Sequence, residues 1–213
     1  MEMAFRKIAS CLILFVAIST AAEFPVKYKT RPGTLKVDET GISYAGAKAT
    51  SFSWKYQDIQ RLTVSPNRIT VLTYQDNRYL LGADRNYDFT GEIPAKELYA
   101  LLSPLLDQRF VAAVAQPPGD ILFAIAAKHV RRITGTEGTI SFGSGFIVYD
   151  TPTKDDSRTW RYQDIQSISS ASPFELTVTT FEQSYNFQLK SPLPESRYNV
   201  LWLEIEKKNR GLQ

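Results

Sequence analysis

The heptad Trp54-Lys55-Tyr56-Gln57-Asp58-Ile59-Gln60 recurs 106 positions later as Trp160-Arg161-Tyr162-Gln163-Asp164-Ile165-Gln166. The two copies differ only in the exchange of Lys55 for Arg161. A long internal repeat bears on architecture before chemistry, because each copy is expected to be one supersecondary unit. The sequence therefore predicts one structural unit written twice.

The similarity extends to both sides of the heptads and covers most of the chain. The first copy carries extra residues within 75–86. The matched positions are Gly33 with Gly138, Ile42 with Ile147, Tyr44 with Tyr149, Ile69 with Leu176, Val71 with Val178, and Tyr87 to Phe89 with Tyr185 to Phe187.

Short strands are predicted in each copy from the alternation of apolar and polar residues. Leu35 and Val37 share one face, and the turn 38–41 joins their strand to the next as a hairpin. Phe52 and Trp54 likewise share one face. Further strands of the first copy are expected over about 61–64, 68–74, 78–81 and 87–89.

Each copy is predicted to close with an amphipathic helix that begins at a proline, Pro94 or Pro194. The apolar stripe of each helix is expected to be buried over the open mouth of the preceding sheet. Pro104 is expected to interrupt the first helix, which then resumes to about Ala115, and residues 116–120 read as a linker. The stripes consist of Leu98, Leu101, Leu102 and Leu105, and of Tyr198, Leu201, Trp202 and Ile205.

This layout of strands, a Trp-x-Tyr-x-Asp-Ile segment and a closing helix resembles the pleckstrin-homology-like superfold, including its bacterial PH and GRAM-like members. The resemblance covers about 24–114 and 121–209. It implies a mainly β chain of two tandem, bent antiparallel barrels, each capped by its C-terminal helix. It also implies binding or scaffolding rather than catalysis. No phosphoinositide-type basic motif can be matched, and fold analogy alone does not assign a ligand.

The N-terminus has the features of a secretory signal peptide over residues 1–22. Arg6 and Lys7 precede an apolar run over 8–18, and small residues follow, so cleavage is predicted near Ala22. The run is shorter than the about 20 residues of a membrane span, and an uncleaved N-terminal anchor is the alternative. The mature protein is predicted to be exported, to the periplasm or the cell exterior.

The single cysteine, Cys11, lies inside this segment. The tetrapeptide Ile8-Ala9-Ser10-Cys11 resembles a bacterial lipidation box, but the apolar run mostly follows the cysteine instead of preceding it. We interpret this match as accidental. A mature chain without Cys11 forms no disulfide and no thiolate metal site, so its core alone must hold the fold.

Composition excludes several classes of function. A hydrophobic content of 43% and a charged content of 22% are those of an ordinary folded protein. The net charge of +3 is small, whereas nucleic-acid-binding proteins concentrate Lys and Arg. No nucleophile elbow, phosphate-binding loop or dinucleotide fingerprint occurs. We expect no catalysis, cofactor, metal or nucleic-acid partner.

The repeated heptad has two readings. The tryptophans could be stacking platforms for a ligand, with Asp58 and Asp164 as acceptors. The structural reading is favoured because duplication within one chain fits a determinant of the fold, with each Asp capping a turn. The predicted core residues are Trp54, Ile59, Trp160 and Ile165.

Two basic stretches occupy equivalent places near the start of each unit and could contact anionic lipid headgroups. In the first stretch, the basic residues alternate and are expected to share one face of a strand. The alternative is solvated charge that protects an edge strand from aggregation. The candidate contact residues are Lys27, Lys29, Arg31, Lys128, Arg131 and Arg132.

Other titratable residues offer no legible site. His129, the only histidine, is predicted to lie at the surface, since it has no metal-ligand partners and no visible Ser/His/Asp arrangement. Asp76, Asp84 and Asp88 do not have the spacing of a calcium loop. Asp155 and Asp156 are expected in a hairpin loop.

The sequence thus predicts a signal peptide over 1–22, a first unit over 23–115, a linker over 116–120 and a second unit over 121–213. The expected function is a non-enzymatic binding or scaffold protein that engages a protein or peptide partner in the cell envelope. An exposed sheet edge or the groove beside the C-terminal helix is the expected docking surface. The alternatives are peripheral binding of anionic lipid and an enzyme with carboxylates at the unit interface. The linker permits either a fixed tandem or a hinged pair.

Overall fold

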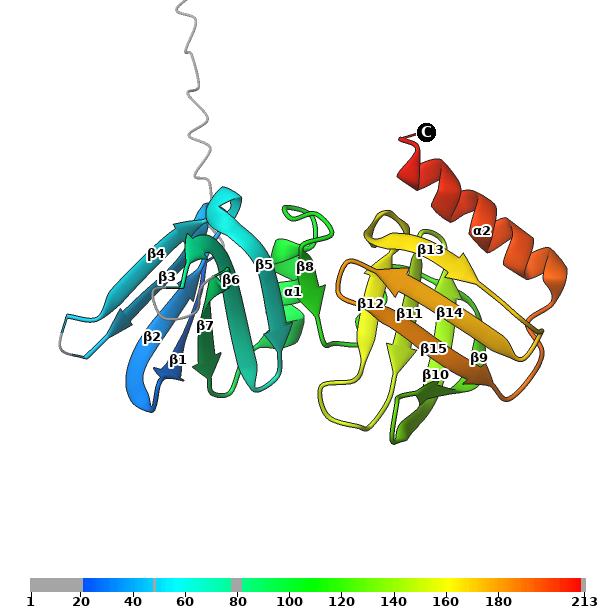
Figure 1. Ribbon diagram of the computed structural model, residues 1–213, viewed down its shortest axis with the longest axis horizontal. Helices are drawn as coiled ribbons and strands as arrows, with labels where there is room; N and C mark the ends of the chain where they lie inside the picture. The colour runs from blue at the N-terminus through cyan, green and yellow to red at the C-terminus, as the bar shows by residue number, and fades with distance from the viewer. Residues whose placement is uncertain (1–20, 48, 78–81, 212–213) are drawn as a thin grey trace, which may run out of the picture.

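The computed structural model describes residues 21–47, 49–77 and 82–211. Within them the chain is mainly β, as predicted, with one sheet of eight strands, one of seven and two α-helices (Figure 1). The first apolar core is formed by residues from Phe24 to Val114, and the second by residues from Ile125 to Ile205. Residues 23–115 are called the first unit below, and residues 121–213 the second unit.

The first sheet has the strand order β4-β3-β2-β1-β7-β6-β5-β8. Its neighbouring strands are antiparallel except β5 and β8, which are parallel. The strands are β1 (Ala22–Tyr28), β2 (Arg31–Val37), β3 (Gly41–Gly46), β4 (Ser51–Lys55), β5 (Ile59–Ser65), β6 (Arg68–Asp76), β7 (Asp84–Thr90) and β8 (Phe110–Ala112).

The second sheet repeats the order of the first seven strands as β12-β11-β10-β9-β15-β14-β13, all antiparallel. In the described parts of the chain, neither sheet closes into a barrel, because β4 does not pair with β5 nor β12 with β13. The strands are β9 (Ile121–Val130), β10 (Gly135–Gly143), β11 (Phe146–Asp150), β12 (Arg158–Arg161), β13 (Ile165–Ser169), β14 (Glu175–Thr180) and β15 (Ser184–Leu189).

Each sheet is followed by one helix, α1 (Ala95–Leu102) or α2 (Glu195–Asn209), which begins directly after the predicted proline. Neither is long and apolar enough to cross a membrane, and the described residues contain no other helix that is. The stripe residues that each helix buries in its core are Leu98 and Leu102, and Leu201 and Ile205.

The predictions for the helices were wrong on two points. Leu105 and Trp202 are 47% and 40% exposed instead of buried. The first helix does not resume after Pro104; the chain forms β8 there, which covers the edge of β5. The short strand is favoured because it satisfies the edge: the Ala113 N–H donates to the Val64 carbonyl at 2.8 Å.

The extra residues of the first unit lengthen the β6–β7 hairpin. Strand β6 continues to Asp76, which pairs with Asp84, and the Asn77 N–H donates to the Ala83 carbonyl at 2.8 Å. The strand predicted over 78–81 lies outside the described residues.

The heptads hold a strand and a neighbouring hairpin together. Their tryptophans and isoleucines are at most 5% exposed and lie in the two cores. The Tyr56 hydroxyl donates to the Asp38 carbonyl at 2.5 Å, and the Tyr162 hydroxyl donates to the Gly143 carbonyl at 2.8 Å. No side chain caps the turn after either tryptophan strand, so the predicted capping role of the aspartates was wrong. The carboxylate of Asp164 binds Arg161 instead.

The segment after β8 packs against the outer face of β12. The Thr159 hydroxyl donates to the Val114 carbonyl at 2.8 Å and accepts the Gln116 N–H at 2.9 Å. A Cβ on Gly119 would meet the Phe146 ring at 3.6 Å, so the linker also passes beside β11. The linker is therefore part of the packing between the units.

Arg161, the residue that distinguishes the heptads, extends from the second unit to the end of α1. Its Nε and Nη2 donate to the Asp164 carboxylate at 2.6 and 2.8 Å. Its guanidinium also donates to the carbonyl of Ser103 and, at 2.9 Å, to that of Leu106. Carbonyls at the end of a helix lack intrahelical partners and attract cations. Its equivalent in the first unit, Lys55, is exposed.

We predict that Arg161→Lys loosens the tandem. Arg161 makes four hydrogen bonds from three separate nitrogens, whereas a lysine has three donors on a single nitrogen and cannot reproduce this geometry. The free energy of unfolding should fall by about 1–3 kcal/mol. Spin labels on Ser53→Cys and Gln188→Cys, one in each unit, should give a broader distance distribution by electron double resonance. Lys55→Arg is the matched control and should change neither quantity. An unchanged distribution in Arg161→Lys would show that Arg161 does not fix the units.

Candidate functional site

The basic residues of the first unit lie around the β1–β2 turn. Lys27 is exposed on β1, Lys29 lies in the turn with a φ of 47°, and Arg31 begins β2. The sequence predicted that the three residues share one face of a strand. This was wrong, because the chain reverses between Lys29 and Arg31. Lys29 lies 5.5 Å from the centre of the Tyr28 ring.

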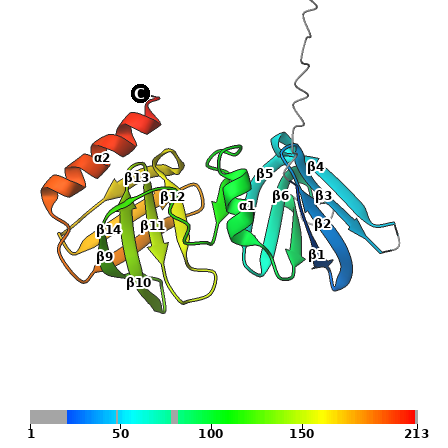
Figure 2. The same ribbon diagram turned by 180° about the vertical axis from the view of Figure 1, so that it is seen from behind.

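The basic residues of the second unit lie at the equivalent β9–β10 turn. Lys128 is exposed on β9, and Arg131 and Arg132 follow the end of that strand. Arg131 forms an ion pair with the buried carboxylate of Asp156 and is not a free cation. The β1–β2 and β9–β10 turns lie at the same end of the molecule, the lower end in Figures 1 and 2.

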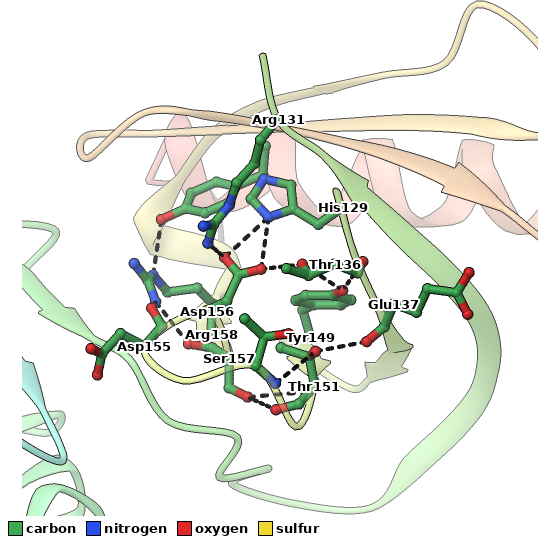
Figure 3. Close-up of polar contacts among 12 residues, drawn as sticks. His129, Arg131, Thr136, Glu137, Tyr149, Thr151, Asp155, Asp156, Ser157 and Arg158 are labelled. Carbon is green, nitrogen blue, oxygen red and sulfur yellow. Dashed lines mark hydrogen bonds and ion pairs between the residues drawn. The ribbon is translucent and has the colours of Figure 1, made fainter. Parts of the chain in front are cut away.

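His129 is buried at 3% exposure, so the prediction that it lies at the surface was wrong. It lies on β9 and faces inward, pairing across the sheet with Phe187. Its Nδ1 lies 3.1 Å from the Asp156 carboxylate, which is 1% exposed (Figure 3). The strand alternation that places Ile125 and Ala127 in the core also points to His129.

A polar network surrounds this pair at the end of the second core (Figure 3). The Thr136 hydroxyl donates to Asp156, and the Tyr149 hydroxyl donates to the Thr136 carbonyl at 2.7 Å. Beside it, Arg158 is 8% exposed, and its Nη2 lies 3.0 Å from Glu182 Oε1. These contacts connect β9, β10, β12 and the loop that carries Asp156.

The same positions of the first unit are aromatic. Tyr28 takes the place of His129. Tyr28 pairs with Phe89, and His129 pairs with Phe187, the residue that matches Phe89. Phe52 takes the place of Arg158. Phe52 pairs with Tyr44, and Arg158 pairs with Tyr149, the residue that matches Tyr44. The rings of Tyr28 and Phe52 contact each other at 5.2 Å. One copy thus ends in apolar packing and the other in a charged network.

Burial and hydrogen bonding shift the pKa of the Asp156 carboxyl in opposite directions. Desolvation raises its pKa, but hydrogen bonds from Thr136, Arg131 and His129 lower it more, and the pKa lies below the ordinary value of 3.8. A buried carboxylate is tolerated only with such partners. The network is therefore a fixed anion held by a cation and hydroxyl and imidazole groups.

The buried part of this network is fully hydrogen-bonded. Every buried side-chain nitrogen or oxygen in the described residues has a hydrogen-bond partner. The neighbouring hydroxyl of Ser157 donates to the Thr151 carbonyl at 3.1 Å, away from the imidazole. No cluster of three metal-ligating side chains occurs among those residues. The arrangement can hold the 151–157 loop in place but offers no nucleophile.

Several exposed apolar residues lie beside α2, among them Leu122 at 69% and Val200 at 60% exposure, whereas Ile133, at 92%, lies in the β9–β10 turn. A groove of about 740 Å³ runs between this helix and the start of β9. Phe123 and Phe142 form its floor, stacked with centroids 4.5 Å apart, and the Arg197 guanidinium lies 4.3 Å from the Phe123 ring centre. The lining of this α2 groove is Leu122, Phe123, Phe142, Gly143, Ser144, Gly145, Tyr162, Ser196, Arg197, Val200, Leu201, Glu204 and Lys208.

A second groove, of about 640 Å³, occupies the matching place in the first unit, between α1 and the start of β1. Each groove lies beside the start of the first strand of its unit, whereas the basic turn follows the end of that strand. The lining of this α1 groove is Ala21, Ala22, Glu39, Glu97, Ala100, Leu101, Pro104 and Leu105. The sequence could not reveal either groove, because both depend on where the helix crosses the sheet.

No protein-family model and no curated protein matches the chain. Among solved structures, the C-terminal domain of an unknown protein from Leishmania infantum is 14% identical, with 41% of this chain and 85% of that chain covered and a TM-score of 0.34. The Spt16D Pob3N heterodimer is 12% identical, with 76% and 83% covered and a TM-score of 0.32. Likeness at this level carries no conclusion about function.

We predict that Asp156→Asn destabilises the protein by about 1–3 kcal/mol at neutral pH, because it removes the charged acceptor of the buried Thr136 hydroxyl and of the partly exposed Arg131 guanidinium. The folded pKa of Asp156 lies below the unfolded one. Its stabilising effect is therefore complete above about pH 4 and is lost as the pH falls through the folded pKa.

Urea unfolding followed by circular dichroism checks this prediction. The difference between wild type and variant should be largest at pH 7 and shrink toward pH 2–3. Asp150→Asn, at an exposed carboxylate on the neighbouring strand, is the matched control. A difference that does not depend on pH would contradict the assignment of the effect to the charge.

Proposed function

We propose that this protein is an exported, non-enzymatic binding or scaffold protein built from two pleckstrin-homology-like units. The α2 groove takes up an apolar segment of a protein partner in the cell envelope. The observation that carries the proposal is the exposed apolar surface around a groove with an aromatic floor. The alternative of an enzyme at the unit interface would depend on Glu97 and Asp150, the two carboxylates that line a pocket of about 460 Å³ between the units.

The exposed residues lie on both sides of the α2 groove. Leu122 is 69% exposed at the start of β9, and Val200 is 60% exposed on α2. Ile121 and Leu203 add further apolar surface at 49% and 50% exposure. Contiguous exposed apolar surface commonly marks an interaction site, and a helix-lined groove is a recurrent mode of peptide recognition.

The repeated strand order supports the pleckstrin-homology-like assignment of both units. Seven strands follow the same order in each sheet, and one helix comes after the seventh. This is the layout that the sequence resemblance implies, with open sheets in place of closed barrels. Export rests on the N-terminal sequence alone, because residues 1–20 lie outside the described structure.

A photocrosslinker tests the proposal directly. With p-benzoylphenylalanine in place of Leu122, the tagged protein, expressed in cells, should give a discrete adduct with an envelope protein. The same substitution at Ser53, exposed on β4 of the first unit, is the control and should give none. Val200→Asp should abolish the adduct, because a carboxylate in the groove must be desolvated on binding. No adduct at Leu122, or equal adducts at both positions, would sink the proposal.

A second candidate is peripheral binding of anionic lipid, favoured by the position of the two basic turns at one end of the molecule. Lys29 and Arg132 are exposed there, one in each unit. A cation near an anionic membrane contributes about 1 kcal/mol. If lipid is bound, flotation with anionic vesicles should weaken with salt and with the double variant Lys29→Glu, Arg132→Glu. Flotation that is equal with neutral vesicles would rule this candidate out.

A further inference from the structure

The two grooves are equivalent places that differ in charge. The helices start in step at Pro94 and Pro194, so Glu97 of the first unit corresponds to Arg197 of the second. Both residues line their grooves, and Leu101 and Leu201 line them one turn further along. An apolar lining has thus been kept while the charge at one equivalent position is inverted.

The helix itself does not account for the inversion. Both positions lie in the first turn of a helix, where the positive end of the macrodipole favours an acidic residue. Glu97 fits that preference, but Arg197 opposes it. The Arg197 guanidinium lies 4.3 Å from the centre of the Phe123 ring and forms part of the groove lining.

The remaining charges extend the difference. Lys208 also lines the α2 groove, and the one carboxylate there, Glu204, is paired with Lys207 at 2.7 Å. The α1 groove is lined by Glu97 at the equivalent position, and its described lining contains no basic residue. The α2 groove is therefore basic and the α1 groove acidic.

We propose that the two grooves bind apolar peptide segments of opposite flanking charge. The α1 groove takes a segment with basic flanks, and the α2 groove takes one with acidic flanks. The apolar lining supplies affinity in both, and the rim charges select the partner, since charge complementarity acts mainly on specificity and on the rate of association. The inference rests on the proposed function of the α2 groove and extends it to the first unit.

Two short helical peptides with the same leucine face, one flanked by glutamates and one by lysines, are the probes. Their binding is measured by fluorescence anisotropy on the protein that begins at Ala21, which retains both alanines of the α1 groove. Glu97→Lys should weaken the lysine-flanked peptide about tenfold and leave the other unchanged, and Arg197→Glu should do the converse. Glu175→Lys and Arg68→Glu, the same charge changes at exposed positions outside the grooves, are the matched controls. Equal melting temperatures confirm that each variant is folded.

The inference is overturned if each variant affects both peptides alike, or if neither peptide binds saturably. Those failures leave the proposed function standing where Leu122 still crosslinks to an envelope protein. Conversely, selective peptide binding without any crosslinked partner would support the charge selection and count against the envelope role. If the selection is electrostatic, peptide affinity should fall as the salt concentration rises, and this dependence should be lost in the charge variants.

Discussion

The burial of both faces of β11 is the constraint on which the tandem depends. Ile147 and Tyr149 face the second core, whereas Phe146 and Val148, at 1% and 3% exposure, lie outside it on the opposite side. A strand apolar on both faces must be covered twice. The linker and the end of the first unit cover the outer face of β11. At the edge of this cover, the Arg161 guanidinium donates to the Leu106 carbonyl after α1. Separation of the units would expose this apolar face and the carbonyls together.

Duplication explains the scaffold, and the differences between its copies explain the rest. The outward side of β3 carries Ser43 where β11 carries Val148, so the first unit keeps a solvated face where the second has an interface. The exchange of Lys55 for Arg161 falls on the same face. A change that would be mild on a solvated surface is consequential here, because the planar guanidinium makes four hydrogen bonds from three nitrogens and a lysine has only three donors on one nitrogen.

Much of the fold could be predicted because it is written in local periodicity. The strands, the hairpin at 38–41 and the helix starts follow from alternation and from proline. The burial of His129 could also have been found, since it continues the inward positions of β9. The apolar run 146–149 is consistent with a strand buried on both faces, but it also fits a strand buried on one face only. The replacement of the expected helix by β8, the charge network and the grooves were not predictable, because each depends on contacts between segments distant in sequence.

The basic turn and the groove of each unit lie at opposite ends of its first strand. At one end, the aromatic packing of the first unit and the His129–Asp156 network of the second close the cores below the basic turns. At the other end, each helix leaves a groove open beside the first strand of its unit. Because the packing between the units fixes one against the other, both grooves are held in one orientation. A partner that engages both then gains effective concentration from the second contact, provided that its segments span the distance between them. In this arrangement the rigid interface, not either groove alone, determines which pairs of segments can bind together.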